Sequence, residues 1–249
     1  GGVKRGIRNP EGVLAPSCPC RRAAAMPGWP IGSHSSPAAA SRRNGERFTF
    51  RIVVYFFLRK ENIMRVVSGS ARGCRLQPVP GMNTRPTTDR VKENVFNLIQ
   101  DHVRDADVLD LFAGTGQLGI EALSRGAAHC DFIEHNGTAY NVVSKNVQTA
   151  RVQDRASLHR VEARDFLAKA AAKKYSLIFL DPPYGGTILE NALSGIERFD
   201  ILSANGIIIC ESAVEDRFAH GFEVVRERRY GATMITVLRR QDGGTDERS

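Results

Sequence analysis

The sequence predicts an α/β protein in which most strands of a single sheet run parallel. Segments with the pattern of buried strands alternate with amphipathic helical segments, and repeated β-α units join parallel strands through right-handed crossovers. The last two strand-like segments have no helix between them, which predicts an antiparallel hairpin at one edge of the sheet. The composition, 42% hydrophobic and 25% charged over 249 residues, is that of an ordinary globular protein.

The first 63 residues differ from the rest of the chain in charge. They hold 11 Lys and Arg against 3 Asp and Glu, whereas residues 64–249 hold 24 of each kind. The basic character therefore belongs to this leading segment and does not indicate that the main domain binds nucleic acid. Residues 1–46 show no strand or helix period and are predicted to be disordered. An organelle transit peptide is another interpretation of the leading segment. The preferred one is that residues 1–63 are a non-native extension upstream of a natural start at Met64.

Residues 64–86 are predicted to form a small hairpin and a loop. Two short strand patterns, 65–68 and 74–78, enclose two glycines. Residues 79–90 are the only long connection in the domain, so they are a candidate binding loop. A helix is expected to begin at Thr87, because apolar residues then recur at helical spacing.

Residues 87–240 are predicted to form the main domain, and residues 241–249 a polar tail. Apolar runs of strand length predict strands, and apolar stripes with a period of 3.6 residues predict helices. The predicted strands are 108–112, 129–134, 157–161, 176–180, 207–211, 222–229 and 233–239, and the later helices are 117–125, 138–150, 166–173 and 187–199.

Several classes of protein are excluded. The longest wholly apolar run, residues 52–58, is seven residues long, whereas a membrane-spanning helix needs about 20. Five scattered cysteines argue against a disulfide framework and favour a reducing, cytoplasmic location. No His or Cys cluster indicates a metal site.

A glycine-rich turn follows the strand at 108–112 and opens a helix. Gly114, Gly116 and Gly119 have G-x-G-x-x-G spacing, which lets the backbone approach a ligand at the N-terminus of a helix. Glu134 ends the next strand, 20 residues after Gly114, where it can accept hydrogen bonds from ribose hydroxyls. This pattern fits NAD or another cofactor that carries adenosine.

Asp110 favours one of these cofactors. A carboxylate at the mouth of the first strand would repel a pyrophosphate but suits the ammonium of an amino acid. S-adenosylmethionine carries such an ammonium, a ribose and no phosphate. Asp165, after the third strand, could accept from the adenine amino group or cap a helix, and both interpretations stay open.

The segment Asp181-Pro182-Pro183-Tyr184 follows the fourth parallel strand. Two prolines fix the backbone and remove two N–H donors, so the loop presents a carboxylate, carbonyls and an aromatic ring. Acceptors at Asp181 and at the Pro182 carbonyl would bind an exocyclic amine and stabilise positive charge on its nitrogen. Tyr184 could stack on an extruded base. These four residues are the predicted catalytic residues.

Together these motifs resemble class I S-adenosylmethionine-dependent methyltransferases that act on exocyclic amines. The closer resemblance is to the bacterial RsmD type, which methylates N2 of guanine-966 in 16S ribosomal RNA. The resemblance covers residues 64 to about 240 and rests on these stretches: 64–76, 84–93 with Phe96 and Asn97, 109–116, 121–127, 181–184 and 229–231.

This resemblance implies a Rossmann-like sheet of seven strands, a small N-terminal hairpin and an rRNA substrate within the assembled small ribosomal subunit. It implies that S-adenosylmethionine is held by residues of the strand ends and the glycine loop, with Thr87 and Arg90 near its methionine end or the target base. The predicted cofactor-binding residues in the main domain are Asp110, Phe112, Gly114, Thr115, Gly116, Glu134 and Asp165.

Two basic segments stand out in the otherwise neutral domain. Residues 65–92 hold six Lys or Arg against one Asp, and residues 226–240 hold five Arg against one Glu. Such segments are expected to contact RNA phosphates. The predicted RNA-binding residues are Arg65, Arg72, Arg75, Arg85, Lys92 and Arg229.

Three alternatives to guanine N2 methylation remain. A DNA adenine-N6 methyltransferase would use the same fold and the same four-residue segment. An NAD-dependent oxidoreductase would use the glycine loop, although Asp110 and Asp181-Pro182 argue against it. A ribosome-assembly factor could keep a relic cofactor pocket without catalysis.

Overall fold

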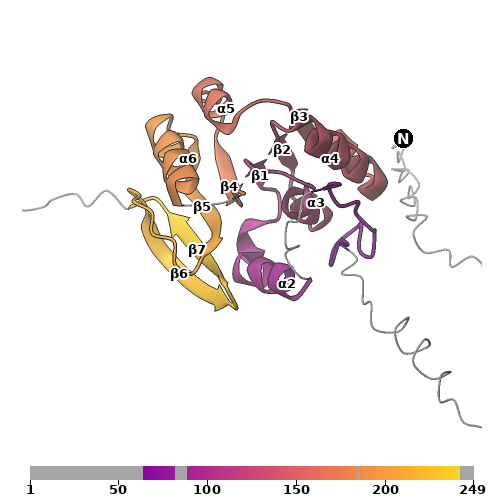
Figure 1. Ribbon diagram of the computed structural model, residues 1–249, viewed down its shortest axis with the longest axis horizontal. Helices are drawn as coiled ribbons and strands as arrows, with labels where there is room; N and C mark the ends of the chain where they lie inside the picture. Colours follow the sequence, from indigo (N-terminus) through magenta and orange to yellow (C-terminus); the bar gives the residue numbers. More distant parts are fainter. Residues whose placement is uncertain (1–63, 82–88, 184–185, 242–249) are drawn as a thin grey trace, which may run out of the picture. The chain divides into compact units, whose positions relative to one another are not determined.

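The computed structural model describes residues 64–81, 89–183 and 186–241, all within the second of the two units into which the chain divides, Ala40–Ser249. The predictions for residues 1–63 and 242–249 lie outside the described residues. The described residues form a seven-stranded sheet with the order β3-β2-β1-β4-β5-β7-β6 (Figure 1). The strands are β1 (Asp107–Asp110), β2 (His129–Ile133), β3 (Ala156–His159), β4 (Tyr175–Leu180), β5 (Leu202–Ala213), β6 (Glu223–Tyr230) and β7 (Thr233–Arg239).

Five strands are parallel and the last two close the sheet as an antiparallel hairpin. β1 pairs in parallel with both β2 and β4, so the chain order reverses between β1 and β4. β7 inserts antiparallel between β5 and β6, which confirms the predicted edge hairpin. The reversal matters because ligands of such sheets bind at the carboxyl ends of the strands beside this switch point.

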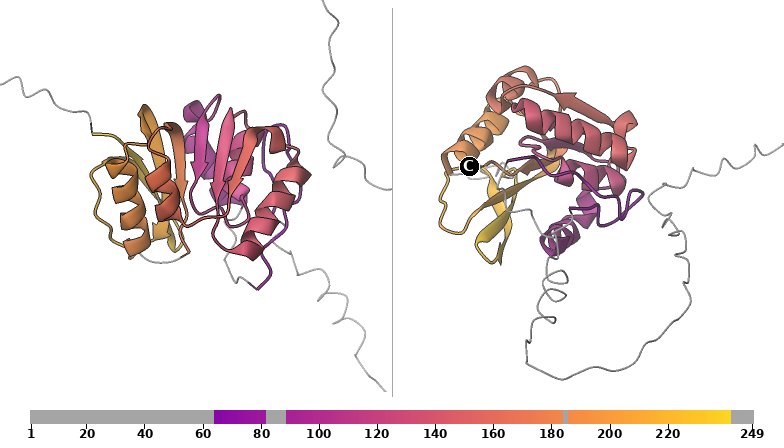
Figure 2. Two further views of the ribbon diagram at one scale, coloured as in Figure 1. Left: turned by 90° about the horizontal axis from the view of Figure 1, so that it is seen from above. Right: turned by 45° about the vertical axis from the view of Figure 1, so that its right-hand side comes forward.

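Helices cover both faces of the sheet, as the views in Figure 2 show. Alternate strand residues face opposite layers: Val108 and Phe179 pack with α2, α3 and α4, whereas Leu109 and Ile178 pack with α5 and α6. The helices are α2 (Asp89–Leu98), α3 (Gln117–Ser124), α4 (Gly137–Ala150), α5 (Ala163–Lys169) and α6 (Gly186–Arg198), with 3₁₀ turns η2 (Gln100–His102) and η3 (Gln153–Arg155). In the part of the chain described, no helix is long and apolar enough to cross a membrane.

The predicted N-terminal hairpin is present in a short form: Arg65 and Arg75 form an antiparallel bridge, and the Val66 and Leu76 N–H groups donate to the Cys74 and Met64 carbonyls. Beyond this pairing, backbone amides of the segment donate to a side chain of helix α3. Val67 and Ser68 donate their N–H groups to the Glu121 carboxylate at 2.7 and 2.9 Å. Residues 64–81 therefore combine a short hairpin with docking on the helix layer.

Most element boundaries differ from the predictions by one or two residues, and two elements differ by more. Helix α5 begins at Ala163 and ends at Lys169, about one turn earlier than predicted. Its last turn is closed by the Ala170 N–H, which donates to the Phe166 and Leu167 carbonyls, and the chain then leads to β4. Strand β5 runs from Leu202 to Ala213 and is longer than the predicted 207–211. At its start Leu202 pairs with Tyr175 of β4, and at its end pairing with β7 continues to Ala213.

Candidate functional site

A cavity of about 1410 Å³ opens at the carboxyl ends of the parallel strands. Its lining residues follow β1, β2, β4 and β5 and include the first turn of α5. The lining divides along the sheet. The glycine loop and Glu134 lie at the ends of β1 and β2, whereas Asp181 and Glu211 lie at the ends of β4 and β5. One cavity thus spans both predicted parts of the site.

The glycine loop has the backbone that only glycine adopts without strain. Gly114 and Gly116 have φ values of 55° and 76°, and Gly116 is the N-cap of α3. A Cβ at Gly116 would lie 2.4 Å from Val143 Cγ2, and one at Gly119 would lie 2.3 Å from Phe132 Cε1. The first two glycines therefore permit the turn, and the third permits close packing of α3 on the sheet.

Asp110 is the most buried acid of the site, with 2% exposure. Its Oδ2 accepts the Gly119 N–H at 3.1 Å, so the carboxylate binds the first turn of α3. Burial raises the pKa of Asp110 to about 7. The hydrogen bond from the Gly119 N–H opposes this shift, and the charge of Glu134 adds to it. A cation placed in the cavity would favour the ionised form of Asp110.

Glu134 joins the end of β2 to the glycine loop. Its Oε2 accepts the Gly114 N–H at 2.9 Å, and its Oε1 accepts the Asn136 N–H at 2.7 Å. Asn136 in turn caps α4 by accepting the N–H groups of Thr138 and Ala139. Glu134 is therefore held in place, and each carboxylate oxygen keeps a further lone pair for a hydroxyl donor.

Asp181 follows β4 and lies in the same cavity as Asp110. Burial raises the pKa of Asp181 well above its ordinary value, and the charges of Glu211 and then Asp110 add to this shift. Pro182 and Pro183 also line the cavity, and neither has a backbone N–H. Tyr184 lies outside the described residues.

The other predicted cofactor residues are only partly brought together. Phe112, Thr115 and Asp165 line the cavity. Asp165 is in the first turn of α5 and is not its N-cap, a position that Glu162 occupies. Arg90 is exposed on α2 and is not among the lining residues. Thr87 lies outside the described residues.

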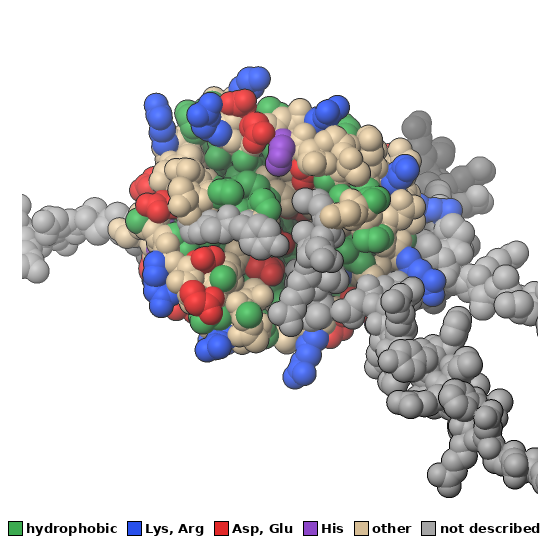
Figure 3. All heavy atoms as spheres, in the orientation of Figure 1, with side chains coloured by type: hydrophobic (Ala, Val, Ile, Leu, Met, Phe, Trp, Pro, Cys, Tyr) green, Lys and Arg blue, Asp and Glu red, His purple; other side chains and the backbone are tan. Residues whose placement is uncertain are grey.

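Acidic groups dominate the described lining. In Figure 3, several acidic side chains lie toward the middle of the face viewed and Lys and Arg lie mostly toward its rim. Arg164, Arg198 and His135 are the basic side chains that accompany seven carboxyls in the lining. Those carboxyls belong to Asp110, Glu134, Glu162, Asp165, Asp181, Glu211 and Asp216. Such a lining favours a cationic ligand over a pyrophosphate.

The model of the protein family described as Conserved hypothetical protein 95 matches residues 64–239. The chain belongs to this family. Its membership confirms the predicted resemblance to RsmD-type methyltransferases, and S-adenosylmethionine is the cofactor that this membership implies.

Similar proteins agree with the family. Ribosomal RNA small subunit methyltransferase D of Escherichia coli (strain K12) is 38% identical over 188 residues, which is 74% of this chain and 93% of that protein. The protein of the same name from Haemophilus influenzae is 35% identical over 151 residues, covering 60% and 78% of the two chains. The solved structure of Escherichia coli yhhF, which is named as a methyltransferase, has a TM-score of 0.64 at 35% identity and covers 72% and 98%. These comparisons confirm the class I methyltransferase fold.

Two lining residues of this family member were missed by sequence reasoning. Gln117 begins α3, and its Oε1 atom is buried without a hydrogen-bond partner among the described residues. Its position directly after Gly116 is the signal that could have identified it. Glu211 ends the strand predicted at 207–211 but belongs to no short motif, and in the structure it lies within β5 and lines the cavity.

Four of the predicted RNA-binding residues have exposed side chains, and one was predicted wrongly. Arg65, Arg72, Arg75 and Arg229 are exposed, and Arg65 forms an ion pair with Asp89 at 2.7 Å. Arg85 lies outside the described residues.

Lys92 was predicted wrongly as a phosphate contact, because its side chain is 0% exposed. It faces the docked segment 64–68, donates to the Arg65 carbonyl and lies 4.0 Å from Glu121 Oε2.

Proposed function

We propose that this chain transfers a methyl group from S-adenosylmethionine to N2 of a guanine in small-subunit ribosomal RNA. By family resemblance the target is guanine-966 of 16S rRNA in the assembled subunit. The observation that carries this proposal is that Asp181 and Pro182 share one cavity with Asp110 and the glycine loop. The names of the relatives from Escherichia coli and Haemophilus influenzae support the rRNA substrate.

The residues at the ends of β1 and β2 fit this cofactor. Asp110 and the glycine loop would hold its amino-acid end, Glu134 its ribose, and Asp165 its adenine. The acidic lining suits a sulfonium, whereas the pyrophosphate of NAD would face the carboxylates of Asp110 and Glu134. When bound, S-adenosylmethionine supplies an electrophilic methyl carbon.

The residues after β4 prepare the amine for reaction. An exocyclic amine is a poor nucleophile because its lone pair is delocalised into the ring. Asp181 and the Pro182 carbonyl would accept its two N–H groups and favour the pyramidal form in which the lone pair is available. As the new N–C bond forms and the S–C bond breaks, the Asp181 carboxylate stabilises positive charge on nitrogen and can accept its proton.

Affinity for S-adenosylmethionine is expected to rise as the pH increases through about 7, the value to which burial raises the pKa of Asp110. Below this value a proton must leave Asp110 before its carboxylate can face a cation, so affinity falls by up to about tenfold per pH unit. Isothermal titration calorimetry across this range measures the effect. Asp110→Asn is the control and should show a weaker and flatter profile. Identical profiles for the two proteins would contradict the role of Asp110.

Binding to 16S rRNA is expected to weaken with salt and to depend on Arg75. This residue is exposed in the segment 64–81, of which Met64 and Val79 line the cavity. Arg75→Ala should reduce the slope of log K against log salt by about 0.7 to 1, because one phosphate contact is lost. Arg104→Ala is the matched control, since Arg104 is exposed before β1, at the amino end of the sheet. Equal slopes for Arg75→Ala and wild type would remove Arg75 from the RNA surface.

The proposed function is tested with labelled S-adenosylmethionine and three substrates: naked 16S rRNA, assembled small subunits and duplex DNA. The expected result is label in one N2-methylguanosine of 16S rRNA, identified by mass spectrometry, with assembled subunits as the better substrate. Label in N6-methyladenine of DNA would support the DNA methyltransferase alternative. Binding of S-adenosylhomocysteine without methylation of any substrate would support the non-catalytic alternative.

A further inference from the structure

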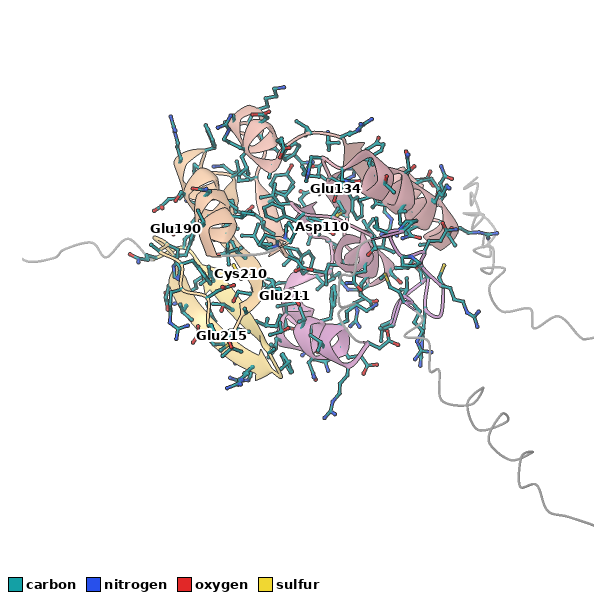
Figure 4. All side chains as sticks on the ribbon, in the orientation of Figure 1. Asp110, Glu134, Glu190, Cys210, Glu211 and Glu215 are labelled. Carbon is teal, nitrogen blue, oxygen red and sulfur yellow. The ribbon has the colours of Figure 1, made fainter. Side chains whose placement is uncertain are left out.

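Glu211 lies beside Asp181 at the carboxyl ends of two paired strands. β4 and β5 pair in parallel with Leu180 opposite Cys210, so the next residues of both strands, Asp181 and Glu211, are at the same level. Both line the cavity. Figure 4 shows Glu134, Asp110 and Glu211 following one another across the strand ends, with Glu211 on the side away from the ribose-binding carboxylate Glu134.

The closeness of Asp181 and Glu211 affects what this end of the cavity can bind. Two neighbouring carboxylates repel each other, and the charge of Glu211 is the largest electrostatic contribution to the raised pKa of Asp181. A ligand that brings a hydrogen-bond donor to each of the two carboxylates would offset this repulsion. The adjacent Pro182 and Pro183 add carbonyl acceptors and no N–H donor. This end of the cavity therefore suits a ligand with two neighbouring donors.

Guanine has such a pair of donors on its Watson–Crick edge. Its ring N1–H lies next to the exocyclic N2 amine, so one carboxylate can accept from each. Adenine has an unprotonated N1 at the corresponding place, and the lone pair of that nitrogen would face a carboxylate oxygen. Two side-by-side acceptors thus distinguish the two purines, whereas Asp181 alone would accept from the amine of either.

We propose that Glu211 accepts the N1–H of the target guanine and so selects guanine over adenine, while Asp181 accepts from the amine that is methylated. This inference rests on the proposed function and adds the residue that determines base specificity. Glu211 makes no bond in the reaction. It holds the ring so that N2, and no other amine, lies at Asp181.

The inference is tested with 2,6-diaminopurine, which keeps the amine at C2 but has an N1 without hydrogen. Small subunits are reconstituted with 16S rRNA that carries either guanine or 2,6-diaminopurine at position 966. We expect wild-type protein to prefer guanine by roughly 100-fold or more in kcat/KM, because a site built for an N–H donor rejects the analogue that lacks it. Mass spectrometry identifies the methylated nitrogen.

Glu211→Gln changes the preference in a way that a structural role would not. The glutamine amide can accept from the guanine N1–H or donate to the unprotonated N1 of 2,6-diaminopurine, so the preference should fall to within about tenfold. Glu215→Gln is the matched control, because Glu215 is exposed and is not among the lining residues. It should keep the wild-type preference.

Three results would overturn the inference. Equal turnover of both substrates by wild-type protein would do so without any variant, and therefore does not depend on whether Glu211→Gln folds. An unchanged preference in folded Glu211→Gln would also exclude Glu211 as the specificity residue. Failure of wild-type protein to methylate guanine subunits would overturn the proposed function, and this inference with it.

Discussion

Replacing Asp181 with alanine is expected to lower methyl transfer to rRNA by about a thousandfold while cofactor binding is largely kept. Asp181 lies at the end of β4, and the glycine loop follows β1, so removing the Asp181 carboxylate leaves the contacts of Asp110 and Glu134 in place. The loss should appear in kcat, because the charge that Asp181 stabilises develops on the amine only during the reaction.

The measurement combines single-turnover methylation of small subunits with calorimetry using S-adenosylhomocysteine. Asp154→Ala is the control, since Asp154 is exposed in η3 and is outside the cavity lining. Normal turnover by Asp181→Ala would show that Asp181 does not accept from the amine. Loss of cofactor binding in the same variant would instead place Asp181 in the cofactor site.

Most of the site could be predicted because one topological rule applies to several residues at once. In a parallel sheet the carboxyl ends of all strands meet at one edge, so Asp110, Glu134 and Asp181 could be brought together from their positions after apolar strands. The structure places all three in one cavity. The alternation of strands and helices could also be predicted from the sequence. A separate layer of helices covers each face of the sheet, so residues on both faces of the strands are apolar.

Glu211 satisfies the same rule but belongs to no short motif, so nothing in the sequence alone distinguishes it from an ordinary strand end. Its significance comes from the pairing of β4 with β5, which places it level with Asp181. Gln117 is a similar case, because an unpartnered buried oxygen is visible only when its surroundings are known.

Lys92 shows where a local pattern was misread. The buried stripe of α2 contains Val95 and Phe96 and continues in Ile99, directly after the helix. Lys92 precedes these residues at spacings of three, four and seven, on the same face. A lysine there interrupts the apolar face, and sequence reasoning assigned it to solvent and phosphate. Burial of Lys92 depends on the docking of residues 64–68 on Glu121 of α3, a contact between segments more than 50 residues apart.

Lys92→Met is therefore expected to destabilise the protein, lowering the free energy of unfolding by about 3 kcal/mol. The ammonium is fully buried near the Glu121 and Asp89 carboxylates and donates to the Arg65 carbonyl. Burial lowers the pKa of Lys92, while the charge of Glu121 opposes that shift. Methionine fills the space but leaves the Glu121 charge with fewer compensating groups. For a domain of this size the melting temperature should fall by about 6 to 12 °C.

Urea denaturation measures this loss, and Lys145→Met on the exposed side of α4 is the matched control. In the double variant with Glu121→Gln no buried charge of the pair remains, so its cost should be smaller than the sum of the two single costs. Hydrogen exchange at the Val67 and Ser68 amides should become faster in Lys92→Met, because both donate to Glu121. Unchanged stability together with unchanged exchange would mean that Lys92 does not hold residues 64–68 on the helix layer.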